Sequence, residues 1–295
     1  MKSIDIKRKL IQIAAFGFTN FHMGNFAKGQ IYNGKWKQFC SPGLNCYSCP
    51  AANLACPIGA MQSVASSSMK FSFYVVGILM AIGVVLGRGV CGYLCPFGLL
   101  QELLFKIKSP KIKIPKFLTW TKYVILVLFV IVLPALWVSS LGIAKPWFCE
   151  YICPVGTLEA GIPLLLVNAG LRNIIGPIFS LKLGILIAVI VLSIVCYRFF
   201  CKVMCPLGAI YGLLNKVSLL HIECDKRKCS SCGLCSKACR MDVNPVLNSR
   251  SPECILCGKC VGVCEREALR LTMINRKDVN KDIDIKDSKS FKNNI

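Results

Sequence analysis

The chain has 295 residues with 36 Lys or Arg against 14 Asp or Glu, a formal net charge of +22, yet 55% of it is hydrophobic and its mean hydropathy is +0.58. Nucleic-acid binders are basic but rarely so apolar, and a chain of this size does not need its twenty cysteines as disulfides. The only two histidines, His22 and His221, exclude several histidine-ligated haems and a His-rich metal site. What remains is a membrane protein that binds metal through thiolates, with no nucleic acid as partner.

Four apolar stretches are long enough, or nearly so, to cross a bilayer, which takes about 17–25 apolar residues. These predicted spans are residues 10–27, 71–87, 123–144 and 174–197. A buried helix of a soluble protein is the alternative for each of them, above all for the first, which contains His22 and two asparagines. The basic segment 1–9 is not followed by a small-residue cleavage site, which favours an uncleaved anchor over a signal peptide.

The distribution of Lys and Arg predicts the orientation of these spans. With the N-terminus inside, the inner segments 1–9, 88–122 and 198 onward hold 29 of the 36 basic residues, while the outer segments 28–70 and 145–177 hold six. Cytoplasmic loops carry the excess of basic residues. We therefore expect a multi-pass protein of the cytoplasmic membrane with both termini in the cytoplasm, whose charge also attracts anionic lipid.

A Cys-Pro-apolar-Gly element recurs at the ends of the predicted spans, at Cys56, Cys95, Cys153 and Cys205. Three copies have a second cysteine four positions earlier, at Cys91, Cys149 and Cys201. Proline stops the preceding segment, starts the next helix and leaves backbone N–H groups available to a sulfur. Cysteines four residues apart share one helix face, so two such pairs provide the ligands of a cubane cluster. Structural cysteines at helix ends are the alternative.

The predicted orientation decides which pairs meet. The inner side receives four cysteines, enough for one [4Fe–4S] cluster: Cys91, Cys95, Cys201 and Cys205. The outer side receives six, from which we choose as ligands Cys49, Cys56, Cys149 and Cys153. Cys46 is the first alternate ligand and Cys40 the second, either free or in a disulfide. A self-contained site of Cys40, Cys46, Cys49 and Cys56 is the rival arrangement.

The most specific motif lies after the last span, in two runs of Cys-x2-Cys-x2-Cys-x3-Cys that begin at Cys229 and Cys254. This is the spacing of bacterial two-cluster ferredoxins, in which the fourth cysteine of each run binds the other cluster. The ligands of the first cluster are then Cys229, Cys232, Cys235 and Cys264. Those of the second are Cys239, Cys254, Cys257 and Cys260. Zinc, the alternative, prefers two separated Cys-x2-Cys pairs.

Cys91-x3-Cys95-Pro96 and Cys201-x3-Cys205-Pro206 at span ends, followed by the double ferredoxin run, resemble the NapH/NosR-type membrane iron–sulfur proteins, in particular their uncharacterised members from anaerobes. The resemblance extends to about residue 272 and implies four spans, cytoplasmic clusters and transfer of electrons between a cytoplasmic or quinol pool and a partner across the membrane. The chain lacks the large outer flavin-binding domain of the NosR kind. Its outer cysteines also go beyond the plain NapH pattern.

These features together predict an α-helical membrane protein with four transmembrane helices and a C-terminal α+β ferredoxin-like domain. The membrane domain is residues 1–215, the two-cluster ferredoxin domain 216–274, and the polar tail 275–295. The expected cofactors are four [4Fe–4S] clusters, two of them in the ferredoxin domain.

The function we expect is electron transfer, from a soluble donor such as a ferredoxin or flavoprotein or from a quinone, to a membrane or extracytoplasmic redox partner. The chain is then an electron-transfer component of an oxidoreductase system, without catalytic acid, base or nucleophile. A factor that reduces or metallates an exported enzyme, and an iron–sulfur redox sensor, are the alternatives. One difficulty is the hydrocarbon core, which at about 30 Å is too thick for a single electron hop unless the Cys-Pro elements dip into it.

Overall fold

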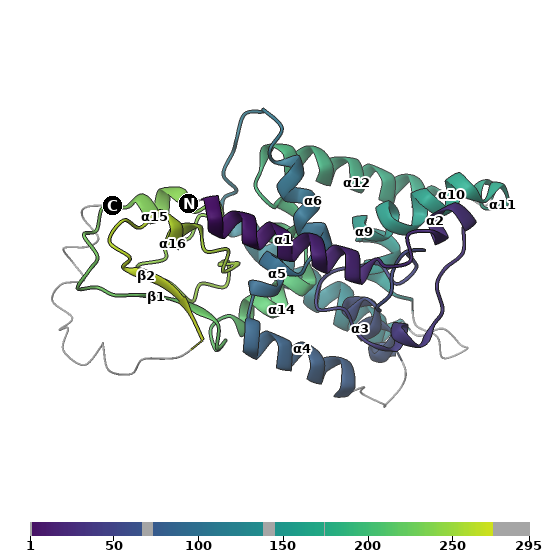
Figure 1. The fold of residues 1–295 in the computed structure, drawn as a ribbon. Helices are drawn as coiled ribbons and strands as arrows, with labels where there is room; N and C mark the ends of the chain where they lie inside the picture. The colour runs from purple at the N-terminus through teal and green to yellow at the C-terminus, as the bar shows by residue number, and fades with distance from the viewer. Residues whose placement is uncertain (1, 67–72, 138–144, 174, 274–295) are drawn as a thin grey trace.

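A computed structural model describes residues 2–66, 73–137, 145–173 and 175–273; the predicted tail 275–295 lies outside the described residues. The described part of the chain is mostly helical. Figure 1 shows helix α1 (Lys2–Thr19) running lengthwise beside the other helices, with its N-terminal end next to the C-terminal segment. The α-helices that follow are α2 (Asn25–Lys28), α3 (Pro57–Ser66), α4 (Phe73–Leu86), α5 (Gly89–Tyr93), α6 (Pro96–Leu104), α7 (Thr121–Ile125), α8 (Leu133–Leu136), α9 (Pro154–Gly156), α10 (Ile162–Val167), α11 (Ala169–Arg172), α12 (Pro177–Val195), α13 (Phe199–Val203), α14 (Pro206–Leu214), α15 (Leu234–Ala238) and α16 (Lys259–Gly262).

Short 3-10 and π-helical segments complete the helical part. They are η1 (Lys35–Gln38), η2 (Lys116–Trp120), η3 (Leu126–Val132), η4 (Phe148–Ile152) and η5 (Thr157–Gly161). Strands β1 (His221–Cys224) and β2 (Leu269–Thr272) form one antiparallel pair, in which Cys224 faces Leu269. This pair holds together the two ends of the segment that carries the ferredoxin-type motif, at one end of the molecule (Figure 1).

Two helices of the described residues are long and apolar enough to cross a membrane: the continuous run Lys116–Leu136 and helix α12. Most of α12 faces outward, and its Leu181, Ile187 and Val191 are each more than half exposed. A core helix of a soluble protein would bury such side chains, whereas a helix in contact with lipid leaves them on the surface. Helix α4, within the second predicted span, is apolar but only 14 residues long.

The first predicted span, 10–27, differs from the structure in its boundaries. Helix α1 begins at Lys2, ends at Thr19 and is followed by a turn before the short helix α2. Arg8 of this helix is almost fully buried, because it pairs with Glu102 of α6 at 2.8 Å. Hydropathy alone therefore misplaced this helix, which extends back to Lys2 through a charged segment whose Arg8 is buried in an ion pair.

Every Cys-Pro element starts a helix: α3, α6, α9 and α14 all begin at the proline that follows a cysteine. The cysteine before the proline is extended, with φ/ψ of −85°/116° at Cys95 and −75°/111° at Cys205. Proline disfavours the helical region for the residue before it, and its own fixed φ suits the first helical turn. In three of the four units, a partner cysteine four residues earlier lies in a short helix, η4, α5 or α13. Each of these three units is a short helix, an extended cysteine and a second helix.

Candidate iron–sulfur centres

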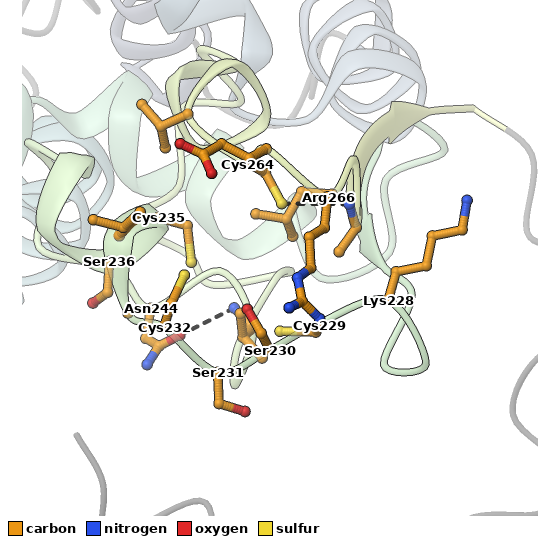
Figure 2. A pocket seen from close by; sticks show the side chains of 17 residues that line it. Lys228, Cys229, Ser230, Ser231, Cys232, Cys235, Ser236, Asn244, Cys264 and Arg266 are labelled. Atoms are coloured by element: carbon orange, nitrogen blue, oxygen red, sulfur yellow. Dashed lines mark hydrogen bonds between the residues drawn. The ribbon is translucent and has the colours of Figure 1, made fainter.

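The first C-terminal set of cysteines surrounds a cavity of about 240 Å³ at the surface. Figure 2 shows the sulfur atoms of Cys229, Cys232, Cys235 and Cys264 pointing toward the same space. These four residues, here called set 1, are the ligands that the spacing predicts for the first cluster. Cys224 of β1 lies outside the motif but contacts Cys229. Set 1 is thus brought together by the two strands and the Cys-x2-Cys-x2-Cys loop.

The second C-terminal set, set 2, consists of Cys239, Cys254, Cys257 and Cys260. Burial, and then the charges of the other three thiols, raises the pKa of Cys260. Burial and the neighbouring Cys257 and Cys239 likewise raise the pKa of Cys254 to about 12. Four thiolates this close and this buried repel one another, and binding to iron relieves that cost.

Sets 1 and 2 are related by an internal repeat of the backbone. In both Cys-x2-Cys-x2-Cys loops the residue two positions after the first cysteine has a positive φ, 54° at Ser231 and 52° at Leu256. A glycine follows two positions later in each, Gly233 and Gly258, with φ of 71° and 74°. Left-handed residues turn the chain tightly enough for three cysteines to face one centre. The repeat in the sequence is therefore also a repeat in conformation.

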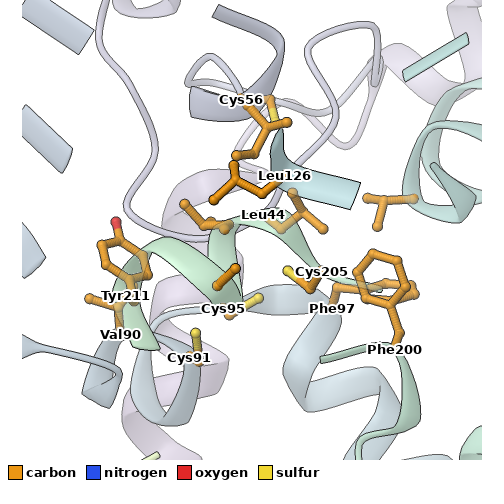
Figure 3. Packing of buried hydrophobic residues seen from close by; sticks show 14 of the residues in the cluster. Leu44, Cys56, Val90, Cys91, Cys95, Phe97, Leu126, Phe200, Cys205 and Tyr211 are labelled. Atoms are coloured by element: carbon orange, nitrogen blue, oxygen red, sulfur yellow. The ribbon is translucent and has the colours of Figure 1, made fainter. Parts of the chain in front are cut away.

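The inner set, Cys91, Cys95, Cys201 and Cys205, comes from the helix pairs α5–α6 and α13–α14. Figure 3 shows the sulfur atoms of Cys91, Cys95 and Cys205 near one another in the buried core. Burial, and then the charges of Cys201 and Cys91, raises the pKa of Cys95 to about 12. Backbone N–H groups point at these sulfurs, as the amide of Gly208 donates to Sγ of Cys205 at 3.3 Å.

Two buried arginines connect the two halves of the inner set. Each precedes one cysteine pair and donates to the backbone of the other pair. Arg88 lies three residues before Cys91 and donates to the carbonyl oxygen of Cys201 at 2.8 Å. Arg198 lies three residues before Cys201 and donates to the carbonyl oxygen of Cys91 at 2.5 Å. Both side chains are fully buried. They fix the two short helices to each other and place positive charge beside a site that would hold an anionic cluster.

Carboxylates from two other parts of the chain compensate these arginines. Glu102 of α6 accepts from Arg198 at 2.6 Å and from Arg8 at 2.8 Å. Burial alone would favour the neutral acid, but the two guanidinium groups outweigh it and lower the pKa of Glu102 to about 2. Glu253, next to Cys254 of set 2, accepts from Arg88 at 2.6 Å and pairs with Lys122. Ion pairs therefore bind the inner set to α1 on one side and to the C-terminal segment on the other.

The cysteines that line the outer cavity differ in one residue from the predicted outer ligands. A cavity of about 810 Å³ is lined by Cys46, Cys56, Cys149 and Cys153, and also by Cys40. Cys49 does not line it; a tight turn in which the amide of Cys49 donates to Cys46 O at 3.2 Å directs Cys49 elsewhere. Its sulfur instead lies 3.9 Å from Oδ1 of Asn20. We therefore replace Cys49 by Cys46 in the outer set, defined from here on as Cys46, Cys56, Cys149 and Cys153.

The rival arrangement, a self-contained site in the first outer loop, is not what the structure brings together. Burial, and then the thiols of Cys149, Cys46 and Cys56, raise the pKa of Cys153, so that residues of two separate segments share this site. Cys40 pairs through its backbone with Ala55 and lies at the edge of the same cavity. Within the described ranges, no cluster of three or more side chains is arranged to hold a single metal ion. A cubane is several ångströms wide and keeps its four thiolates farther apart than one ion does.

The residue six positions after each Cys-Pro cysteine was not among the predicted site residues. In two copies this residue anchors the loop 42–46: Glu159 accepts the amide of Cys46 at 2.8 Å, and the hydroxyl of Tyr211 donates to Pro42 O at 2.9 Å. In the other two copies it is a glutamine, Gln62 or Gln101. Alignment of the four repeats on their Cys-Pro pairs would have shown that all four residues at this position are polar.

Set 2, the inner set and the loop before the outer set are neighbours in the structure. Set 2 abuts the inner set, because Gly92 of α5 is so close to the carbonyl oxygen of Ile255 that no side chain would fit between them. The inner set abuts the loop that leads to the outer set: the amide of Leu44 donates to the thiol of Cys95, and a Cβ at Gly43 would lie 2.9 Å from Cα of Cys95. Figure 3 shows Leu44 between Cys95 and Cys56. Cys46 follows only two residues later, at most about 7 Å along an extended chain.

The sequence is similar to those of known iron–sulfur proteins. A model described as a 4Fe-4S binding domain matches residues 71–115, 124–166 and 181–223, and each of these segments contains one Cys-x3-Cys-Pro element. The uncharacterized protein MJ0750 of Methanocaldococcus jannaschii is 28% identical over 210 residues, which cover 68% of this chain and 78% of the relative. No solved structure matches the chain.

Two further relatives carry ferredoxin-type names. The methylamine utilization ferredoxin-type protein MauN of Methylorubrum extorquens is 27% identical over 260 residues, which cover 85% of this chain and 80% of the relative. The ferredoxin-type protein NapH of Escherichia coli is 25% identical over 229 residues, which cover 73% of this chain and 74% of the relative. By these matches, the chain is similar to ferredoxin-type iron–sulfur proteins of the NapH/NosR kind.

Proposed function

We propose that the protein is a membrane-bound electron-transfer protein with four [4Fe–4S] sites in a row: set 1, set 2, the inner set and the outer set. The observation that carries the proposal is that neighbouring sets are in contact through short stretches of backbone, at Gly92 and Ile255 and again at Gly43 and Leu44. Bound clusters would supply one-electron transfer, while the protein holds them in place and adjusts their potentials.

This arrangement would remove the difficulty of the thick hydrocarbon core. If the inner and outer sets lay at opposite membrane faces, an electron would have to cross about 30 Å in one step. The loop 42–46 instead reaches into the bundle as far as Cys95, and the outer set begins two residues after Leu44. Irregular backbone is tolerated at this depth because protein surrounds it: Leu44 and Asn45 are both buried.

The membrane domain of the proposal comprises residues 1–215 with four spans and both termini in the cytoplasm, and the ferredoxin-like domain comprises residues 216–274. The run Lys116–Leu136 and helix α12 support two of the spans directly by length and composition. The excess of Lys and Arg in the inner segments supports the orientation.

The two ends of the row suggest two kinds of partner. Set 1 borders a surface cavity and Cys232 is exposed, which suits a soluble donor such as a ferredoxin or a flavoprotein. The larger outer cavity, which Lys37 and Lys182 also line, suits delivery to a membrane or extracytoplasmic redox partner, or to a quinone.

One observation favours a second candidate, a factor that reduces or metallates an exported enzyme. Cys40 is a fifth thiol in the outer cavity and belongs to none of the four sets. Under this alternative the outer thiols react with an alkylating reagent in anaerobically purified protein. Under the proposed function Cys46, Cys56, Cys149 and Cys153 are protected by iron.

Iron content tests the proposal directly. Anaerobically purified protein is expected to hold about sixteen iron and about sixteen sulfide per chain, the content of four cubane sites. In vesicles that enclose an impermeant oxidant, an external reductant is expected to reduce that oxidant only when the protein is inserted. An iron content near eight, with no transfer into the vesicles, would leave a ferredoxin domain and no conduit.

The choice of the fourth outer ligand can be tested separately. C46S is expected to lower the iron content by up to about four atoms, because one of four ligands is lost, whereas C49S leaves it unchanged. Iron analysis and low-temperature EPR of both variants measure the difference. The opposite pattern, with iron lost only in C49S, would identify Cys49 and not Cys46 as the ligand.

A further inference from the structure

Gln62 and Gln101 occupy equivalent positions and make equivalent contacts at the outer and inner sets. Each lies six residues after a Cys-Pro cysteine, Cys56 and Cys95, on the helix that the proline starts. Each side chain is only 1% exposed, although a buried amide is costly unless its hydrogen bonds are made. Neither residue belongs to a ligand set.

The amide nitrogen of each glutamine contacts a sulfur atom of the opposite Cys-Pro unit. Nε2 of Gln101 donates to Sγ of Cys201 at 3.1 Å, and Nε2 of Gln62 donates to Sγ of Cys149 at 3.2 Å. Both distances fall within hydrogen-bonding range for sulfur, whose radius exceeds that of oxygen. The acceptor is in both cases the first cysteine of a Cys-x3-Cys-Pro element.

The amide oxygen of each glutamine holds the backbone next to the same cysteine. Oε1 of Gln101 accepts the N–H of Phe200 at 3.1 Å, and Oε1 of Gln62 accepts the N–H of Phe148 at 3.0 Å. These phenylalanines directly precede Cys201 and Cys149. A third bond, from Nε2 to the carbonyl oxygen four residues earlier, orients each amide on its own helix.

The same contacts of a buried glutamine occur at both sites, which argues against a chance arrangement. Two buried glutamines from different helices make the same three kinds of bond, at matching positions around two sites that share no residue. A polar group needed only to fill space would not have to reproduce a sulfur contact. The oxygen and nitrogen assignment is also settled by chemistry, because the backbone N–H requires an acceptor and so leaves the NH₂ group facing the sulfur.

From this geometry we infer that Gln62 and Gln101 are positioning residues that hold one ligand cysteine of each site and raise the reduction potential of the cluster bound there. The inference rests on the proposed function. A hydrogen bond to a ligand sulfur stabilises negative charge, and the reduced cluster carries one more negative charge than the oxidised one. The N–H group therefore favours the reduced state.

The test compares midpoint potentials from EPR-monitored redox titration of the purified holoprotein. Q101M replaces the amide by a side chain of similar length without an N–H donor. It is expected to shift the reduction equilibrium of the inner cluster roughly tenfold toward the oxidised form, which is about 59 mV for one electron. Q62M is expected to do the same to the outer cluster, and each variant leaves the potential of the other site unchanged.

A matched control is Q12M. Gln12 is also 1% exposed and lies on α1, where it accepts from Arg8 at 3.4 Å and its Nε2 makes no hydrogen bond among the described residues. This variant measures the effect of losing a buried amide as such, and is expected to leave both potentials unchanged. If Q101M does not fold, Q62M applies the same test at the other site.

The possible failures are distinguishable. Wild-type protein without signals from the inner and outer clusters would overturn the proposed function itself. Intact clusters with unchanged potentials in both Q101M and Q62M would overturn only the role of the glutamines. A shift of the same size in Q12M would show that the effect is general destabilisation.

Discussion

Replacement of Cys95 and Cys205 by alanine is expected to remove about four of some sixteen iron atoms and to reduce electron transfer into vesicles to the background rate. The two residues come from different Cys-Pro units, so the variant loses half of the ligands of the inner set. Set 2 and the outer set are then separated by the whole inner site. The two C-terminal clusters are expected to remain, because their ligands lie in residues 229–264 alone.

C196A is the matched control for this variant. Cys196 is also buried, at 7% exposed, and directly follows α12, but it belongs to none of the four sets. Its loss is expected to change neither iron content nor transfer. Unimpaired transfer in the Cys95 and Cys205 double variant would exclude a route through the inner set.

Replacement of Glu102 by glutamine is expected to lower the free energy of unfolding by about 3–5 kcal/mol, the usual cost of breaking a buried ion pair. Glu102 is 6% exposed and compensates Arg8 and Arg198, which are both buried. Tyr197 also donates to this carboxylate at 2.9 Å. The neutral amide removes the counter-charge that Glu102 gives Arg198 and leaves Arg8 with the more distant Asp5, at 3.6 Å. Denaturant unfolding in detergent, followed by tryptophan fluorescence, measures the change.

In the wild-type protein, lowering the pH should remove the contribution of Glu102 to the free energy of unfolding. The folded pKa of Glu102, about 2, lies below its ordinary value of 4.5, so folding favours the ionised form. Its contribution to stability is therefore complete above pH 4.5 and is lost as the pH falls from there toward 2. E102Q is expected to lack this part of the acid dependence.

K113M is the control for the ion-pair prediction. Lys113 is 89% exposed and lies 4.0 Å from Asp242, so this pair is screened by water and its loss is expected to cost less than about 1 kcal/mol. Equal effects of E102Q and K113M would show that the buried network does not hold the inner set in place.

A site can be predicted from the sequence when its ligands lie close together along the chain. The C-terminal cysteines are recognisable because their ligand spacing is a property of short loops, in which Ser231 and Leu256 adopt the same left-handed conformation. The grouping of Cys91 and Cys95 with Cys201 and Cys205 can be predicted once the orientation of the spans is known. As metal ligands all eight C-terminal cysteines and the inner set remain predictions, which the iron analysis addresses.

The remaining features depend on contacts that spacing does not encode. The exchange of Cys49 for Cys46 depends on a single turn, and the position of α1 depends on the ion pair between Arg8 and Glu102. The proximity of the inner and outer sets depends on the loop through Leu44, which no hydropathy pattern indicates. Gln62 and Gln101 read as ordinary helical residues until their partners across the bundle are known.

The close fit of Gly92 against Ile255 bears on how fast the protein can work. Carriers that visit one partner and then swing to another are limited by tumbling and by the viscosity of the medium. Here the backbone of the C-terminal segment contacts helix α5 without an intervening side chain, and ion pairs from Arg88 and Lys122 hold the same junction together. Under the proposed function, no domain motion then has to precede electron transfer from set 2 to the inner set. The rate of that step is expected to be the same in dilute buffer and in concentrated sucrose.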